Sequence, residues 1–344
     1  MSTFAPTETL KRTINELEVD ISLGRAETLD GLAKKGCLQT VKSTDLEWNV
    51  SVGGGDAAWG AFTNSGTASN TSSTVSANVS IGSYKVYHKF GINKVVLQNA
   101  KTRGVGSQKR LLERHIKDAL RVIRRKVNEA LWLGDGTANY GGVVGLGVVT
   151  NNTLPYANIN PATWSNWIAQ IIENGGVATA LTKATLMDLK ELIHVQETDF
   201  DCIFTSPATA KAYNTLFDSI AGDLQLTNGY GSGEVDLGTG DRYWHKVPLM
   251  EDSFTPNGQI ITMYSPDIEV CSFDMSDADY GMMNRFGFNT NIAPITSAEV
   301  NGLNVNIAML PPNVPGVYEF EIFCLPQLRV FNRKSIQGIK DILV

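Results

Sequence analysis

Residues 111–137, LLERHIKDALRVIRRKVNEALWLGDGT, carry the strongest structural pattern in the chain. Apolar residues recur there at three- and four-residue steps, as on the buried face of an amphipathic helix. Ser107 is a suitable N-terminal cap, and no proline or glycine follows it until Gly134. We therefore predict a single helix over residues 107–133, about 40 Å long at 1.5 Å per residue.

The polar face of this helix is strongly basic. Its cations are Lys109, Arg110, Arg114, Lys117, Arg121, Arg124, Arg125 and Lys126, against Glu113, Asp118 and Glu129. The whole chain has a net charge of −6, so any attraction to nucleic acid is local. The face is either a solvated surface or one that meets nucleic-acid phosphates without reading sequence.

A long segment, 43–82, is rich in Gly, Ser, Thr, Asn and Ala. Loops of this length without a core of their own are uncommon and usually bind something. Trp59 and Phe62 near its centre therefore look like anchors for a partner surface. The alternative is a disordered linker.

The rest of the chain mixes helix and strand patterns. The N-terminal 36 residues have the look of an arm with a short helical pattern. Helices are predicted over 164–172, around 186–193 and from Pro207, where Ser206 is a suitable cap. Strands are predicted at 83–98, 202–205, 244–250, 259–264 and 268–273, and through the tail from 301. The predicted class is α+β.

No motif points to catalysis, a cofactor or a metal. Gly31 and Gly36 have phosphate-loop spacing, but Cys37 stands where that loop needs lysine. The histidines are isolated, and the cysteines are too far apart for a zinc site, which favours reduced, buried thiols. These residues are His88, His115, His194 and His245, and Cys37, Cys202, Cys271 and Cys324. No segment approaches the ~20 apolar residues of a membrane span, and no signal peptide is apparent, so we expect a cytosolic product.

Residues 111–137 with the following GVVGL resemble the spine helix and turn of tailed-bacteriophage major capsid proteins with the Hong Kong 97 fold. Further resemblances follow in matching order along the chain. TSPATAKAYNTLFDSIAGDLQL (205–226) and WHKVPLMEDSFTPNGQIITMYSPDIEV (244–270) are similar to parts of the family's axial domain and later strands. YEFEIFCLPQLRVFNRKSIQGIKDI (318–342) resembles the closing sheet of its peripheral domain.

This resemblance implies a division of the chain. Residues 1–36 would be the N-terminal arm and 37–82 the extended loop, which in the family lies across a neighbouring subunit. Residues 83–155 and 300–344 would be the peripheral domain, with the spine helix and an antiparallel sheet. Residues 156–299 would be the axial domain.

The resemblance also implies a function. Copies would assemble into hexamers and pentamers of an icosahedral head around double-stranded DNA, in the virion and, during assembly, in the host cytoplasm. Lys117, Arg121, Arg124 and Arg125 would face the DNA nonspecifically. Other expected partners are a portal, a decoration protein and, because the arm is short, a separate scaffolding protein; no enzymatic activity, cofactor or membrane is expected. The alternatives are an encapsulin-type nanocompartment shell and an α/β enzyme without a recognisable motif.

Overall fold

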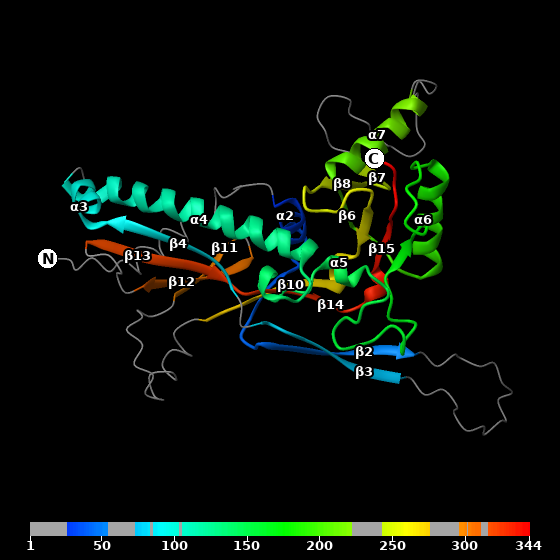
Figure 1. Ribbon diagram of the computed structural model, residues 1–344, viewed down its shortest axis with the longest axis horizontal. Helices are drawn as coiled ribbons and strands as arrows, with labels where there is room; N and C mark the ends of the chain where they lie inside the picture. The colour runs from blue at the N-terminus through cyan, green and yellow to red at the C-terminus, as the bar shows by residue number, and fades with distance from the viewer. Residues whose placement is uncertain are drawn as a thin grey trace. The chain divides into compact units, whose positions relative to one another are not determined.

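The computed structural model describes residues 26–53, 73–82, 85–102, 105–221, 243–275, 296–300, 302–310 and 316–344. They belong to two compact units, between which the chain passes several times. Unit 1 contains residues 1–44, 81–145 and 269–328, and unit 2 contains residues 45–80, 146–268 and 329–344. Both combine helices with sheets (Figure 1), which confirms the predicted α+β class.

Unit 1 is built on the long helix α4, Val105–Leu133, which confirms the helix predicted over 107–133. Its apolar face, including Ile116, Leu120 and Ile123, is fully buried. Figure 1 shows α4 running along an antiparallel sheet with strand order β11-β12-β13-β4. The strands are β4 Val86–Asn93, β11 Thr296–Val300, β12 Leu303–Leu310 and β13 Val317–Cys324. Phe90 of β4 stacks on His115 of α4 and on Phe320 of β13, which joins the helix to the sheet.

A second helix, α3, Lys94–Thr102, lies where the strand predicted over 83–98 was expected to continue. The strand ends at Asn93, whose side-chain oxygen accepts a hydrogen bond from the Val95 N–H at 2.8 Å. Asparagine favours such helix starts because it pairs a free N–H of the first turn. The prediction was wrong because Val95 and Val96 resemble strand residues, although both are largely exposed on the helix.

Unit 1 also holds the first described helix of the chain, α2, Glu27–Lys34, which lies within the predicted N-terminal arm, 1–36. Strand β1, Leu38–Val41, follows and pairs in parallel with β10, Ile268–Phe273. β14, Pro326–Val330, lies on the other side of β10.

Helix α4 ends in a turn that leaves no room for a side chain at two positions, Gly134 and Gly145. A Cβ on Gly134 would lie 2.4 Å from the Ala130 carbonyl oxygen, and one on Gly145 would lie 2.6 Å from the same atom. The Gly145 N–H donates to the Gly134 carbonyl at 2.9 Å, so the chain folds back against the end of the helix. Gly145 therefore belongs to the turn that follows α4.

Unit 2 is built on a six-stranded mixed sheet with strand order β5-β15-β9-β6-β8-β7. Its strands are β5 Gln170–Ile172, β6 Cys202–Thr205, β7 Tyr243–Trp244, β8 Val247–Glu251, β9 Ile260–Met263 and β15 Ile336–Ile339. Helices α6, Lys183–Val195, and α7, Pro207–Ala221, confirm two predicted helices. Leu189 of α6, Ala210 of α7 and Ile203 of β6 meet in one fully buried core.

Two predictions for unit 2 do not hold. Residues 164–172 form turns and the short strand β5 instead of a helix, because Trp167 is buried against Tyr156 within an irregular segment. Residues 300–344 were expected in one domain with the long helix. Strand β15 instead pairs with β9 and β5 in unit 2, whereas residues 269–273 of β10 belong to unit 1.

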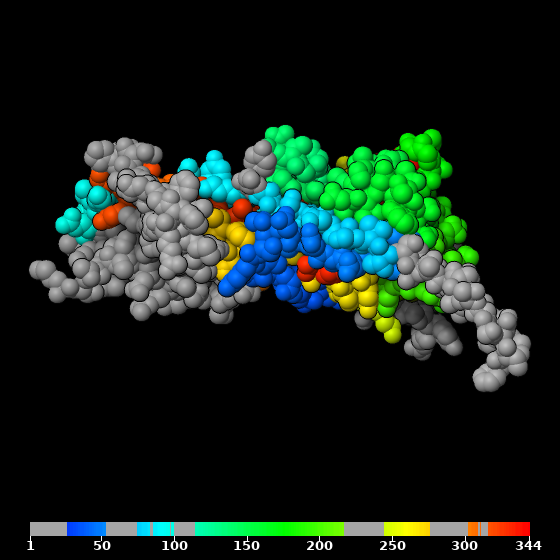
Figure 2. Space-filling view, turned by 90° about the horizontal axis from the view of Figure 1, so that it is seen from below, coloured from blue at the N-terminus to red at the C-terminus, as the bar shows by residue number. Residues whose placement is uncertain are grey.

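A two-stranded antiparallel ribbon completes unit 2. It consists of β2, Asp45–Gly53, and β3, Ser73–Ser80. One side is buried through Leu46, Val50 and Ala77. Figure 2 shows the cyan residues of β3 next to green residues of the same unit, and the Asn78 N–H of β3 donates to the Ala157 carbonyl at 3.1 Å.

Candidate functional site

The exposed face of α4 carries most of the predicted basic stripe. Arg121 and Arg125 are exposed one helical turn apart, and Lys117 is half-buried. Arg114 and Lys126 are also exposed, and Lys126 forms an ion pair with Glu129 at 2.7 Å. Cations therefore outnumber carboxylates on the described part of this face. Its net positive charge would attract a polyanion.

Arg124 departs from this pattern. Its side chain is only 5% exposed, and its guanidinium forms an ion pair with Asp30 of α2. Arg124 occupies the edge of the buried face, where the helical period brings it into line with Leu120 and Val127. The prediction that Arg124 projects away from the buried face is wrong, because the buried Arg124 side chain forms the ion pair that links α2 to α4.

Two further residues of α4 hold α2 at successive turns from Arg124. The Asn128 side-chain oxygen accepts a hydrogen bond from the Leu29 N–H at 3.0 Å. The Trp132 indole N–H donates to the Thr28 hydroxyl at 2.8 Å. We call Arg124, Asn128 and Trp132 the α2 clasp. Their spacing of four residues places the three side chains on one face of the helix.

The described strands of the predicted extended loop, 37–82, are β1, which pairs with β10 in unit 1, and the β2–β3 ribbon of unit 2. Trp59 and Phe62, the predicted anchors, lie outside the described residues. Strands β2 and β3 pair from Asp45 opposite Ser80 to Gly53 opposite Ser73, with an irregularity between Ser51 and Gly53. The segment that joins the two strands therefore starts and ends at the same end of the ribbon.

A buried arginine of unit 2 was not singled out from the sequence. Arg333 is fully buried, and its guanidinium donates hydrogen bonds to five backbone carbonyls. We call these the carbonyl cage: Val148, Val149, Asn151, Leu154 and Trp167, at 2.6–3.3 Å. Burial lowers the pKa of Arg333 to about 10, so it remains a cation at neutral pH. The fork of donors on arginine suits this many acceptors.

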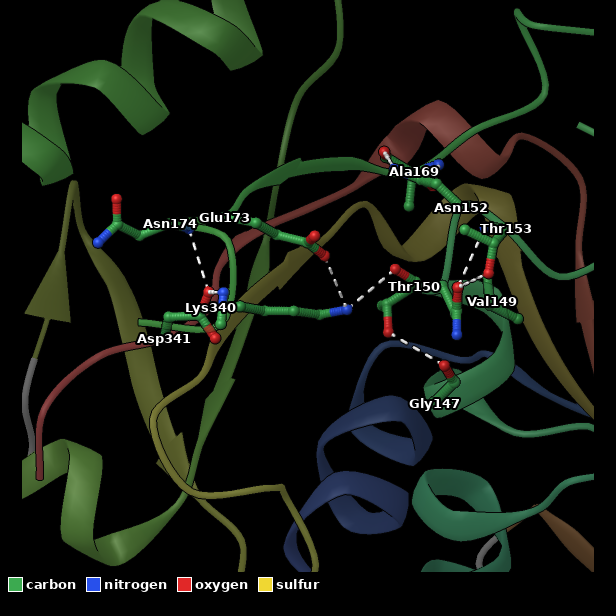
Figure 3. A network of polar contacts seen from close by, with 12 residues as sticks. Gly147, Val149, Thr150, Asn152, Thr153, Ala169, Glu173, Asn174, Lys340 and Asp341 are labelled. Atoms are coloured by element: carbon green, nitrogen blue, oxygen red, sulfur yellow. Dashed lines mark hydrogen bonds and ion pairs between the residues drawn. The ribbon is translucent and has the colours of Figure 1, made fainter. Parts of the chain in front are cut away.

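The two residues after β15, Lys340 and Asp341, make further contacts to loops of unit 2. The Lys340 ammonium lies between the Thr150 carbonyl, at 3.1 Å, and the Glu173 carboxylate, at 3.3 Å (Figure 3). The Asp341 carboxylate accepts the N–H groups of Asn174 and Gly176 at 3.1 and 2.8 Å. All these partners lie in loops, so the C-terminal residues order a stretch of chain that has little regular structure of its own.

No candidate metal centre forms among the residues that the structure describes. No three His, Cys, Asp or Glu side chains come together there as metal ligands would. The four cysteines are buried, as predicted, and burial raises the pKa of the Cys324 thiol to about 12. Within the same described part of the chain, no helix has the length and apolar character needed to cross a membrane.

Neither a family model nor a curated protein matches the sequence. Among solved structures, the capsid asymmetric unit of cyanophage A-1(L) matches with a TM-score of 0.71 at 20% identity, over 94% of both chains. The capsid of a native GTA particle gives 0.55 at 12%, and that of an empty GTA particle 0.53 at 10%, each over 91% of this chain and 90% of that chain.

These matches establish the class of structure. The chain has the Hong Kong 97-type capsid fold that the sequence resemblance implied. Fold alone does not assign function, since one fold can serve different roles.

Proposed function

We propose that this chain is the major capsid protein of a tailed bacteriophage, a structural subunit of an icosahedral head built from hexamers and pentamers. The observation that carries the proposal is the match to a cyanophage capsid over 94% of both chains. Two further features support the proposal: the β2–β3 ribbon, as a contact to a neighbouring copy, and the basic face of α4, as a contact to DNA. The proposal includes a virion location, assembly in the host cytoplasm and the absence of enzymatic activity.

The first part of the proposal concerns contact between copies. The segment joining β2 to β3 would lie across a neighbouring subunit, with Trp59 and Phe62 as apolar anchors. Replacing both by serine should block closure of shells while leaving the paired strands intact. Thr74→Ala, on the exposed side of β3, is the control and should assemble normally. Normal closure of the double variant would rule out this role for the two aromatic residues.

The second part concerns DNA. Lys117, Arg121 and Arg125 would face the packaged genome and reduce its repulsion from an acidic shell. Arg124 is left out because it is committed to Asp30. Exposed charge pairs are screened within a Debye length of about 8 Å at physiological salt, so these cations would act weakly and together.

The triple variant K117Q, R121Q, R125Q tests the DNA contact. Empty shells should form in normal yield, while DNA-filled particles become fewer. The matched control neutralises three exposed lysines of unit 2, Lys183, Lys190 and Lys211, and so makes the same change of net charge. Equal loss of empty and filled particles in the triple variant would show that these residues serve assembly instead.

The remaining partners extend the same proposal. A separate scaffolding protein, a portal and a decoration protein would complete the head. An encapsulin-type shell is the competing outcome, because it would form with a protein cargo. The nucleic-acid content of purified native particles distinguishes the two: genome-length double-stranded DNA supports the phage head, and protein cargo without DNA supports the nanocompartment.

A further inference from the structure

The irregular segment of unit 2 contains a strained turn at the point where it meets the ribbon. Ala157 and Asn158 both have positive φ, 55° and 62°, and Tyr156 and Ile159 exchange two backbone hydrogen bonds across them. A positive φ is unfavourable for alanine, and such strain persists only where the surroundings enforce it. The carbonyl of Ala157 accepts the Asn78 N–H of β3, so the strain lies at a ribbon contact.

Two other contacts hold the opposite strand of the ribbon. The Asn166 side-chain amide donates to the Val52 carbonyl of β2 at 3.3 Å. The Trp48 ring of β2 meets the Phe331 ring edge to face, with centroids 6.0 Å apart and planes at 74°. Residues 157, 166 and 331 therefore each contact the ribbon at a different residue.

The groups that contact the ribbon lie close in sequence to Arg333 or to its carbonyl cage. Its carbonyl cage begins at Val148 and ends at Trp167, so it brackets the strained turn and lies next to Asn166. Trp167 stacks on Tyr156, and its indole N–H donates to the Tyr156 carbonyl at 3.3 Å. Phe331 precedes Arg333 by two residues, and the Tyr156 hydroxyl accepts the Val330 N–H at 3.0 Å. Arg333 and its carbonyl cage thus lie close in sequence to all three of these ribbon contacts.

We infer that residues 147–169, held by Arg333, form a socket that sets the direction of the β2–β3 ribbon in unit 2. Arg333 is then a positioning residue for contact between copies. This part of the inference rests on the proposed function, whereas the orientation of the ribbon does not. A buried guanidinium with five acceptors suits the task, because a shift in the cage would leave a charge and several carbonyls unpaired at once.

The test uses hydrogen exchange of the unassembled full-length chain. The double variant N166A, F331L removes two ribbon contacts without touching the cage. It should speed exchange of the β2 and β3 amides about 3- to 10-fold, the range expected for one or two modest contacts. Amides of β9 should exchange as in the unchanged protein. Asn174→Ala, which removes an exposed side chain of the same unit, is the control and should leave the ribbon unaffected.

Arg333→Lys tests the cage itself, because lysine keeps the charge but has fewer donors. It should speed exchange in both the ribbon and residues 147–169. Unchanged ribbon exchange in the double variant, or an equal increase throughout unit 2, would overturn the inference even if Arg333→Lys fails to fold. Shell closure is scored separately by electron microscopy: if the unchanged chain never assembles, the proposed function fails while the exchange data still decide the socket.

Discussion

Replacing Asn128 by alanine should release helix α2 from α4. Helix α2 begins at Glu27, and Ala26 before it provides no side-chain cap. The side chain of Asn128 instead accepts the Leu29 N–H, one of the first-turn donors that has no partner within the helix. Leu29 is 1% exposed and Asn128 is fully buried, so the truncation leaves a backbone donor buried where water has little access.

The size of the effect follows from this burial. Leaving a buried donor unpaired costs about 1–3 kcal/mol, and loss of an N-terminal cap typically costs about 1 kcal/mol. A local loss of about 1–3 kcal/mol corresponds to roughly 5- to 150-fold faster exchange of amides that open with the helix. The clasp residues Arg124 and Trp132 remain in the variant, so α2 should still fold.

Hydrogen exchange of the Glu27–Lys34 amides measures this release directly. Asp118→Ala is the matched control, because Asp118 is an exposed residue of α4, the helix that also contains Asn128. Loss of its side chain should change the free energy of unfolding by less than about 0.5 kcal/mol. Slow exchange of α2 in Asn128→Ala, equal to that of the control, would refute the reasoning that Asn128 caps α2.

Three further predictions concern separate parts of the chain. Gly134→Ala should destabilise the protein by about 1–3 kcal/mol or more in thermal unfolding, because the new Cβ meets the backbone oxygen of Ala130; unchanged stability would show that the turn can open. A thiol reagent at neutral pH should label none of the four buried cysteines until the chain unfolds. Cys324 should be the least reactive of them, because burial raises the pKa of its thiol to about 12. Rapid labelling of the folded protein would contradict this prediction. Burial and nearby Lys190 lower the pKa of His245 in the folded protein below its ordinary 6.5. Just below pH 6.5 the unfolded state therefore binds more protons at His245 than the folded state does, so the free energy of unfolding should fall as the pH drops through that range. His245→Asn, which suits the positive φ of 50° at this turn, should remove that part of the pH dependence; an unchanged pH profile would exclude His245 as its source.

Regular periodicity accounts for the parts of the fold that the sequence predicted well. Helix α4 has an unbroken apolar face ending at Gly134, and α7 begins with Pro207 after a serine. Strands β6, β9 and β10 are short apolar runs between turn residues, and each lies within about one residue of its predicted range. In all of these, local preference and tertiary packing favour the same structure.

The failures arose where tertiary contacts override local patterns. A helix was predicted over 164–172 from the spacing of its apolar residues. Trp167 instead packs in an irregular segment, and its carbonyl accepts a hydrogen bond from Arg333, which is distant in sequence. Arg124 was assigned to the basic stripe by residue type, but Asp30, 94 positions away, fixes its role. Neither long-range pairing leaves a local signal, so a single sequence cannot distinguish a buried arginine from an exposed one. The anchoring role of Trp59 and Phe62 stays a prediction.

Electron microscopy of the purified chain, combined with light scattering over a range of concentrations, tests the proposed function most directly. A capsid subunit should form closed, roughly isometric shells or, short of that, ring-shaped capsomers whose abundance rises with concentration. A chain that scatters as a stable monomer at every concentration, with no rings or shells on the grid, would contradict assembly as its function.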